Sequence, residues 1–169
     1  MPGRSNRGVA IHVIKGLKED HKRVKELFQE YTKGSPKRKA QIADITIQEL
    51  EVHADLEERL IYPAIREQID ATDVMNEAIE EHHLVHVLIA ELKNLAPNDE
   101  TFEAKFNVLA ELVKHHIKEE EREMLPQAAT SRIDWDTLSA RVTQRKEQLL
   151  RKHVAPSRRS QKASHGNGN

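Results

Sequence analysis

The sequence contains no cysteine among its 169 residues. Disulfides, thiolate zinc sites and cysteine nucleophiles are therefore excluded, and imidazole and carboxylate remain as the strong metal ligands. Aromatic residues make up only 4% of the chain, and glycine and proline occur six times each, at a few points. No apolar run approaches the roughly 18 residues of a membrane span. We therefore expect a soluble, cytoplasmic protein without membrane contact, in which nitrogen and oxygen atoms hold any metal.

The chain also lacks an excess of charge of either sign. Charged residues form 33% of the sequence, but 27 Lys and Arg nearly cancel 28 Asp and Glu. Such a balance produces no overall field that would select a polyanion or an acidic substrate. The charge balance thus gives no support to a nucleic-acid-binding protein.

Apolar residues recur every three or four positions between the proline and glycine sites, which predicts an all-α protein. We expect long helices over residues 9–33, 36–69, 72–96 and 99–126, and a shorter one over 134–152. Short loops between four long helices favour an up-down-up-down four-helix bundle. The predicted domain is a bundle over 9–130, with an additional C-terminal helix in 131–152 packed on it. Residues 153–169 are small, polar and basic, which predicts a disordered tail.

A motif occurs twice in the chain and indicates a duplicated unit. The pattern His-x3-Glu-Glu-x4-Pro runs from His53 to Pro63 and again from His116 to Pro126. In a helix, the His and the first Glu of each copy lie four residues apart and about 40° around the axis, so both point the same way. This is a metal-ligand spacing, and two copies facing each other would form a richer site. The second Glu of each copy is turned a further 100°, toward solvent or a neighbouring helix, and is not expected to be a ligand.

Several ionisable residues lie on the apolar faces of the predicted helices. Leaving each of them buried and unpaired would cost several kcal/mol, which a marginally stable domain cannot absorb, whereas metal coordination removes this objection. Five imidazoles and two carboxylates exceed the needs of one tetrahedral zinc and contain too much nitrogen for calcium or magnesium, so two metal ions fit best. The predicted metal ligands are His21, His53, Glu57, His82, His86, His116 and Glu120. The remaining histidines, at positions 12, 83, 115, 153 and 165, are predicted to lie away from the site.

These residues resemble the hemerythrin-like family of HHE cation-binding domains. The resemblance covers about residues 14 to 127 and includes an acidic-His dipeptide before each motif, here Asp20-His21 and Glu81-His82. It implies two non-heme iron ions with an oxo or hydroxo bridge, spanned by Glu57 and Glu120. His82, His86 and His116 would hold one iron, and His21 and His53 the other, which leaves an open position for a small molecule. The oxygen-carrying members have aspartate where this chain has Glu120.

The resemblance implies a di-iron protein that binds dioxygen or reacts with peroxide or nitric oxide, in storage, scavenging or sensing. A catalase-like decomposition of peroxide is an enzymatic version of this function. Glu49, one turn before His53, is a candidate partner for its free ring nitrogen. The alternative is a helical metal-binding or partner-binding protein without redox chemistry, with weak nucleic-acid contact through the basic residues of the C-terminal region. Manganese and zinc stay open as occupants, as does the oligomeric state.

Overall fold

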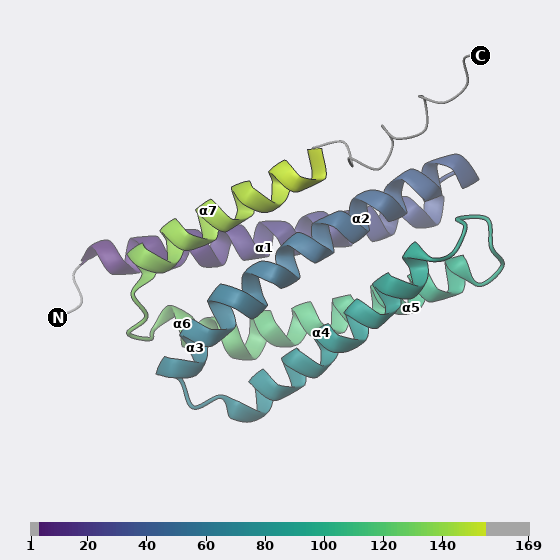
Figure 1. Cartoon of the computed structure of the whole chain (residues 1–169). Coiled ribbons are helices and arrows are strands. Elements are labelled where there is room, and N and C mark those ends of the chain that lie inside the picture. Colours follow the sequence, from purple (N-terminus) through teal and green to yellow (C-terminus); the bar gives the residue numbers. More distant parts are fainter. Residues whose placement is uncertain (1–3, 155–169) are drawn as a thin grey trace, which may run out of the picture.

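The structure is a computed structural model that describes residues 4–154 of the chain. In this range it contains helices and no strand, and four long helices run up, down, up and down (Figure 1). They are α1 (Arg4–Lys33), α2 (Pro36–Leu56), α4 (Thr72–Lys93) and α5 (Phe102–Glu119). The predicted all-α four-helix bundle is confirmed. Of the predicted tail, His153 and Val154 belong to the last helix, and residues 155–169 lie outside the described residues.

Both copies of the repeated motif pass through a short π-helix before their proline. The first, η1 (Glu57–Ile61), continues into α3 (Tyr62–Gln68), and the second, η2 (Glu120–Met124), continues into α6 (Leu125–Ala129). Proline has no N–H to donate to the carbonyl four residues earlier. The preceding turn is wider in both copies, and the residue before each proline donates its N–H to the carbonyl of Glu57 or Glu120, five positions back. Helices with such π turns are frequent at functional sites.

The helix starts follow local capping chemistry. The hydroxyl of Ser35 accepts the N–H of Arg38 at 3.3 Å and starts α2 with Pro36 in its first turn. By contrast, α5 begins three residues later than expected, because the Asp99 carboxylate accepts the N–H of Thr101 at 2.8 Å and holds a turn there. Such Asx turns compete with helix formation.

The additional C-terminal helix, α7 (Trp135–Val154), lies along α1 and α2 (Figure 1). Its first two turns bury Trp135 and Leu138. Farther along, the guanidinium of Arg145 donates to both carboxylate oxygens of Asp55 on α2, at 2.7 and 2.9 Å. Apolar burial in the first turn and a bidentate ion pair near the middle of the helix fix α7 against one side of the bundle.

Two apolar clusters fill the bundle and leave a polar layer between them. One surrounds Trp135 near the ends of α3, α6 and α7, and the other surrounds Phe106 near the opposite end. On α1 the buried His21 separates Leu17 of the first cluster from Val24 of the second. The candidate site therefore lies in the middle of the bundle, where water is excluded on both sides. No helix in residues 4–154 is long and apolar enough to cross a membrane.

Candidate metal centre

Four histidines, one from each long helix, meet in two pairs inside the bundle. The Nε2 atoms of His21 and His53 lie 3.1 Å apart, and those of His82 and His116 are also 3.1 Å apart. All four side chains are buried. Two ligand atoms that sit at right angles on one metal, each about 2.1 Å from it, are about 3 Å apart. The spacing within each pair fits imidazoles that share one ion.

Two buried glutamates connect the pairs. Glu57 Oε1 lies 2.9 Å from Nε2 of His53 in the first pair, and its Oε2 lies 3.2 Å from Nε2 of His82 in the second. Glu120 repeats this arrangement, with Oε1 3.5 Å from His21 and Oε2 3.3 Å from His116. Each carboxylate thus directs one oxygen to each pair of histidines. This is the arrangement of a carboxylate that bridges two metal ions.

The donor set has a defect that a cation would repair. Glu57 Oε1 and Glu120 Oε1 are buried and make no hydrogen bond within the part of the chain that the structure describes. A buried carboxylate oxygen without a hydrogen bond costs free energy, and both oxygens face ring nitrogens of the first pair of histidines, at 2.9 Å for Glu57 and 3.5 Å for Glu120. Two groups of side chains can each hold a metal ion, His21, His53 and Glu57 in one and Glu57, His82 and His116 in the other. The residues therefore fit two ions of a metal that accepts nitrogen and oxygen ligands.

Tyr62 occupies the second half of the site. Its hydroxyl lies 3.3 Å from Nε2 of His82, 3.2 Å from Nε2 of His116 and 3.2 Å from Oε2 of Glu57. It also donates to Oε2 of Glu120 at 2.5 Å. Sequence reasoning missed this residue. In the second copy of the motif the corresponding position is Leu125, so the two halves of the site differ at this point.

His86 lies outside the cluster. Its side chain is 45% exposed, and its Nε2 lies 2.7 Å from Oε1 of Glu58, whereas His82 is buried one turn earlier on α4. The structure thus brings together six of the seven predicted ligands, and the Tyr62 hydroxyl lies where His86 was expected. The predicted surface positions are found for the described histidines 12, 83, 115 and 153, which are exposed, while His165 lies outside the described residues.

The acidic residues of the acidic-His dipeptides hold ligand histidines from outside. Asp20 Oδ2 lies 3.3 Å from Nδ1 of His53, and Glu81 Oε2 lies 2.6 Å from Nδ1 of His116. Such a carboxylate fixes the ring orientation, leaves Nε2 toward the metal and raises the basicity of the ligand. Asp20 thus takes the role for which Glu49 was considered.

The second Glu of each motif does the same for the other two histidines. Glu58 Oε1 lies 2.8 Å from Nδ1 of His82, and Glu121 Oε1 lies 2.8 Å from Nδ1 of His21. Both reach a neighbouring helix, and each crosses to a histidine of the other half of the chain. The doubled Glu-Glu therefore has two uses, since the first residue contacts both pairs of histidines from inside the bundle and the second holds one histidine ring at its Nδ1.

The site carries protons in its metal-free form. Burial lowers the pKa of His53, but the Glu57 carboxylate and the hydrogen bond to Asp20 outweigh it and raise that pKa to about 10. Burial also lowers the pKa of His116, but hydrogen bonds with Glu120 and Glu81 outweigh this effect and raise that pKa to about 10. Each protonated ring neutralises a buried carboxylate. Because a metal needs the neutral ring, binding must release these protons.

The additional helix α7 also reaches the centre. The Nζ of Lys146 lies 3.0 and 3.3 Å from the two carboxylate oxygens of Asp20. Since Asp20 holds His53, a surface cation on α7 is connected to a ligand of the first pair. Among the described residues, no Lys or Arg makes such a contact with Glu81, the corresponding carboxylate of the second half, because α7 packs on α1, α2 and η1 at one side of the bundle.

A small cavity of about 30 Å³ opens onto all four histidines. Its other walls are mainly aliphatic, from Val24, Leu50, Val85, Val113 and Ile117. One water-sized probe needs about 10–15 Å³, so the cavity has room for roughly two non-hydrogen atoms. Tyr62 does not line it and instead lies at a larger hollow of about 440 Å³ with Glu58, Arg66 and His86.

Comparison with known proteins agrees with this geometry. The hemerythrin HHE cation-binding domain model matches residues 12–128. The chain belongs to this family. A solved hemerythrin HHE cation-binding domain-containing protein from Mycobacterium kansasii has 27% identity and a TM-score of 0.66, over 85% of this chain and 92% of that one. A curated DNA nickase from Nostoc sp. (strain PCC 7120) is 28% identical over 106 residues, which are 62% of this chain and 30% of the nickase. The HHE chain thus matches less than a third of that relative's length.

Proposed function

We propose that this HHE protein holds two non-heme iron ions and binds dioxygen, or reacts with peroxide or nitric oxide, at that centre. The observation that carries the proposal is the pair of buried glutamates, Glu57 and Glu120, each with one oxygen toward each pair of histidines. A site with four neutral imidazoles and two carboxylates carries less negative charge than a site built mainly of carboxylates. It therefore suits a metal that cycles between two oxidation states.

The proposed ligand set follows the contacts. His21 and His53 hold the first ion, His82 and His116 the second, and the two glutamates bridge them. Tyr62 replaces His86 as the further donor to the second ion, because its hydroxyl already lies within 3.3 Å of both histidines of that pair. Carboxylates on Nδ1 keep Nε2 of each ring directed at the metal.

The walls of the 30 Å³ cavity select the small ligand. Bound iron would supply the redox chemistry and the coordination position. The protein limits the size of the ligand and excludes water from the cavity. Most of the walls are aliphatic side chains, which exclude water, and the polar lining comes from the four histidines and Asp20. Dioxygen, nitric oxide and hydrogen peroxide each have two non-hydrogen atoms and match the volume.

The first test is metal content combined with reactivity. Protein reconstituted anaerobically with ferrous iron should contain about two irons per chain and should change its absorption spectrum on addition of dioxygen, nitric oxide or peroxide. Release of gas from added peroxide would identify the catalase-like version, and bleaching without gas would identify a binder. One zinc per chain with no spectral response to any of the three would refute the proposal.

A variant in the cavity tests the site of reaction. Val113→Ile adds one methylene to a residue that lines the cavity and should slow the reaction while two irons remain bound. Val108→Ile is the matched control, because Val108 lies on the same helix with its side chain 57% exposed. Equal rates in both variants would mean that ligands reach the metals by another route.

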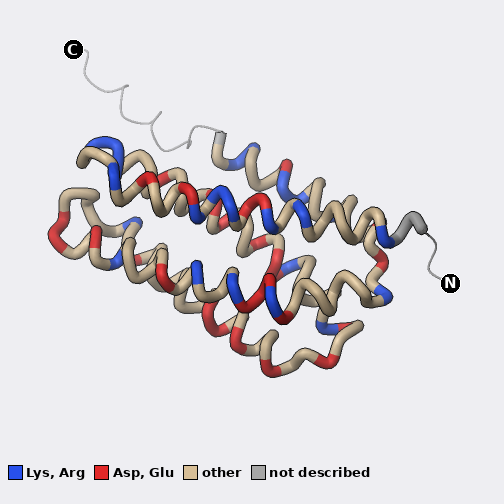
Figure 2. Tube along the Cα trace, turned by 180° about the vertical axis from the view of Figure 1, so that it is seen from behind, with Lys and Arg blue, Asp and Glu red and all other residues tan. Residues whose placement is uncertain are grey.

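One relative acts on DNA according to its name, but the described surface does not support the nucleic-acid alternative. The match to a DNA nickase concerns 30% of that protein. Along the helices of residues 4–154, Lys and Arg are interspersed with Asp and Glu and form no continuous basic face in this view (Figure 2). Two of the basic residues considered for this alternative, Arg145 and Lys146, are paired with the carboxylates of Asp55 and Asp20. Their charge is therefore used within the bundle, and the di-iron proposal ranks first.

A further inference from the structure

Two of the four outer carboxylates, those of the acidic-His dipeptides, have different surroundings. Asp20 is neutralised by Lys146 of α7. Glu81, its counterpart in the second half, has no Lys or Arg partner among the described residues and instead faces His115 and Glu119 on α5. Asp20 is thus paired with a cation, whereas Glu81 lies beside two further side chains that can bind a metal.

The ligand atoms of this second cluster converge on one point. Nε2 of His115 lies 3.5 Å from Oε1 of Glu81 and 3.4 Å from Oε1 of Glu119. Neither contact is a hydrogen bond, and His115 and Glu119 are an i, i+4 pair, as in many metal-binding helices. Ligands at about 2.1 Å from a tetrahedral ion are about 3.4 Å apart. The two separations from His115 match this value, and all three ligand atoms lie within 4.8 Å of one another.

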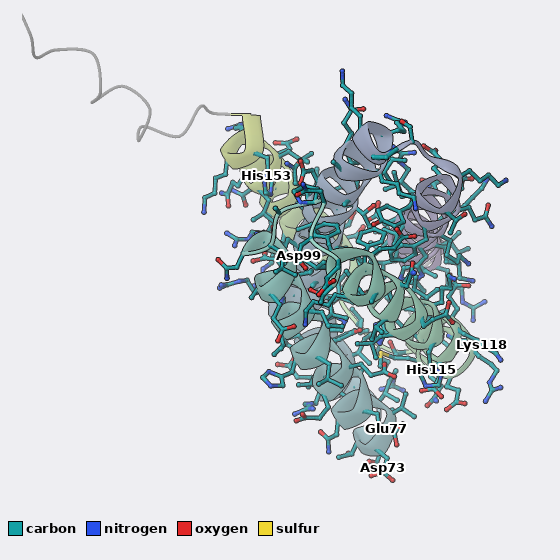
Figure 3. The ribbon with its side chains drawn as sticks, turned by 90° about the vertical axis from the view of Figure 1, so that its right-hand side faces the viewer. Asp73, Glu77, Asp99, His115, Lys118 and His153 are labelled. Carbon is teal, nitrogen blue, oxygen red and sulfur yellow. The ribbon has the colours of Figure 1, made fainter. Side chains whose placement is uncertain are left out.

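This cluster is specific to the second half of the duplicated chain. The positions that correspond to His115 and Glu119 in the first motif are Val52 and Leu56, both buried and apolar. Leu56 lines a cavity together with side chains of α7. In the second half this face is open, and His115 lies at the outer surface of α5 with its side chain 59% exposed (Figure 3).

We propose that Glu81, His115 and Glu119 form a third, solvent-accessible site for a divalent first-row transition metal such as Mn²⁺, Fe²⁺, Co²⁺ or Zn²⁺. One imidazole and two carboxylates suit these ions better than Ca²⁺ or Mg²⁺, and water fills the remaining positions. The site is separate from the buried centre, but Glu81 joins them, because its other oxygen lies 2.6 Å from Nδ1 of His116. An ion on Glu81 would draw electron density from the carboxylate that orients this ligand.

The experiment uses the full chain with its buried centre already filled, whichever metal fills it, so that the result does not depend on the di-iron proposal. A titration with Co²⁺, monitored by calorimetry and by the absorption of cobalt, should show that one further equivalent of Co²⁺ binds. His115→Ala and Glu119→Gln should each raise the Kd of that equivalent tenfold or more. Both substituted side chains are partly exposed, so circular dichroism should confirm an unchanged fold.

The matched control is His83→Ala, which removes an exposed imidazole on α4 outside the cluster and should leave the Kd unchanged. The proposal would be overturned if no further Co²⁺ bound. It would also be overturned if a further Co²⁺ bound with the same Kd in His115→Ala and Glu119→Gln as in the unmodified protein. With a metal that absorbs visible light in the buried centre, Co²⁺ should also shift the spectrum of that centre in the unmodified protein and not in His115→Ala.

Discussion

Replacing Tyr62 with phenylalanine removes one oxygen atom from the centre and little else. The ring is buried, with its centroid 5.3 Å from that of His82, so the phenyl group can keep the packing. Burial and the carboxylates of Glu57 and Glu120 raise the pKa of Tyr62 well above its ordinary value. In the metal-free protein the phenol is therefore protonated and donates a hydrogen bond to Glu120.

The magnitude follows from that bond. A hydrogen bond to a charged group contributes about 1.5–3 kcal/mol, and its loss leaves the carboxylate with one partner fewer. For a chain of this size each kcal/mol changes Tm by roughly 2–4 °C, so the metal-free Tyr62→Phe protein should melt roughly 3–12 °C lower. Under the proposed function, the second iron of the iron-loaded variant loses a ligand. Its affinity should fall at least as far as on loss of an outer partner, about 10–100-fold.

The assay compares Tyr62→Phe with His86→Ala by iron content and absorption. A phenolate bound to ferric iron gives a charge-transfer band in the visible range, so we expect this band in the unmodified protein, its retention in His86→Ala and its loss in Tyr62→Phe. The reverse outcome, with the spectrum intact in Tyr62→Phe and altered in His86→Ala, would refute the assignment and restore His86 as the ligand of the second ion.

Three further predictions test other parts of the site. Glu57→Ala should lose both metal ions, whereas Glu58→Ala, which removes only a ring partner, should bind iron about 10–100-fold more weakly; equal metal content would contradict the bridging role. Lys146→Ala should lower the reduction potential of the centre with less than about 1 kcal/mol of destabilisation, because removing the cation from Asp20 makes His53 more electron-rich, and Arg151→Ala is the exposed control. The pKa values of His53 and His116 are about 10 in the folded protein, against 6.5 when unperturbed. Protonation of these rings therefore stabilises the metal-free fold. This stabilisation is fully present below pH 6.5 and is lost as the pH rises to 10. The Tm of the metal-free form should therefore fall between pH 7 and pH 10, and that of the metal-loaded form should not.

Helical periodicity predicted most of this molecule because the ligands share their helix faces with the apolar core. A histidine such as His21, between Leu17 and Val24 on the same face, has to be buried, so its position could be inferred from the pattern alone. The helix ends were less predictable, since side-chain turns such as that of Asp99 depend on a local competition for backbone N–H groups.

Tyr62 escaped prediction for a geometric reason. In an α-helix it would lie five residues and about 140° around the axis from Glu57, which directs it away from the metals. The π turn bonds the N–H of Tyr62 to the carbonyl of Glu57 and brings the tyrosine to about the angle of an i+4 neighbour, roughly 40°. The Pro63 that follows was a signal of an irregular turn but not of its width. For His86, an i+4 spacing from His82 preserves direction but moves the side chain one turn along the axis, where it contacts Glu58 and not the buried cluster.

The asymmetry of the centre follows from differences between two copies of one motif. Each half of the chain supplies two histidines, one buried glutamate and two outer carboxylates. This shared set can hold two equivalent ions. Tyr62 breaks the equivalence, because the matching position in the other copy is the apolar Leu125. Under the proposed function, the second ion is then closed by a protein ligand. The first ion would be held by His21, His53 and the Oε1 atoms of Glu57 and Glu120, with no counterpart of Tyr62, and would therefore have one protein ligand fewer. The small ligand should therefore bind at the first pair of histidines, next to the half of the bundle that α7 and Lys146 cover.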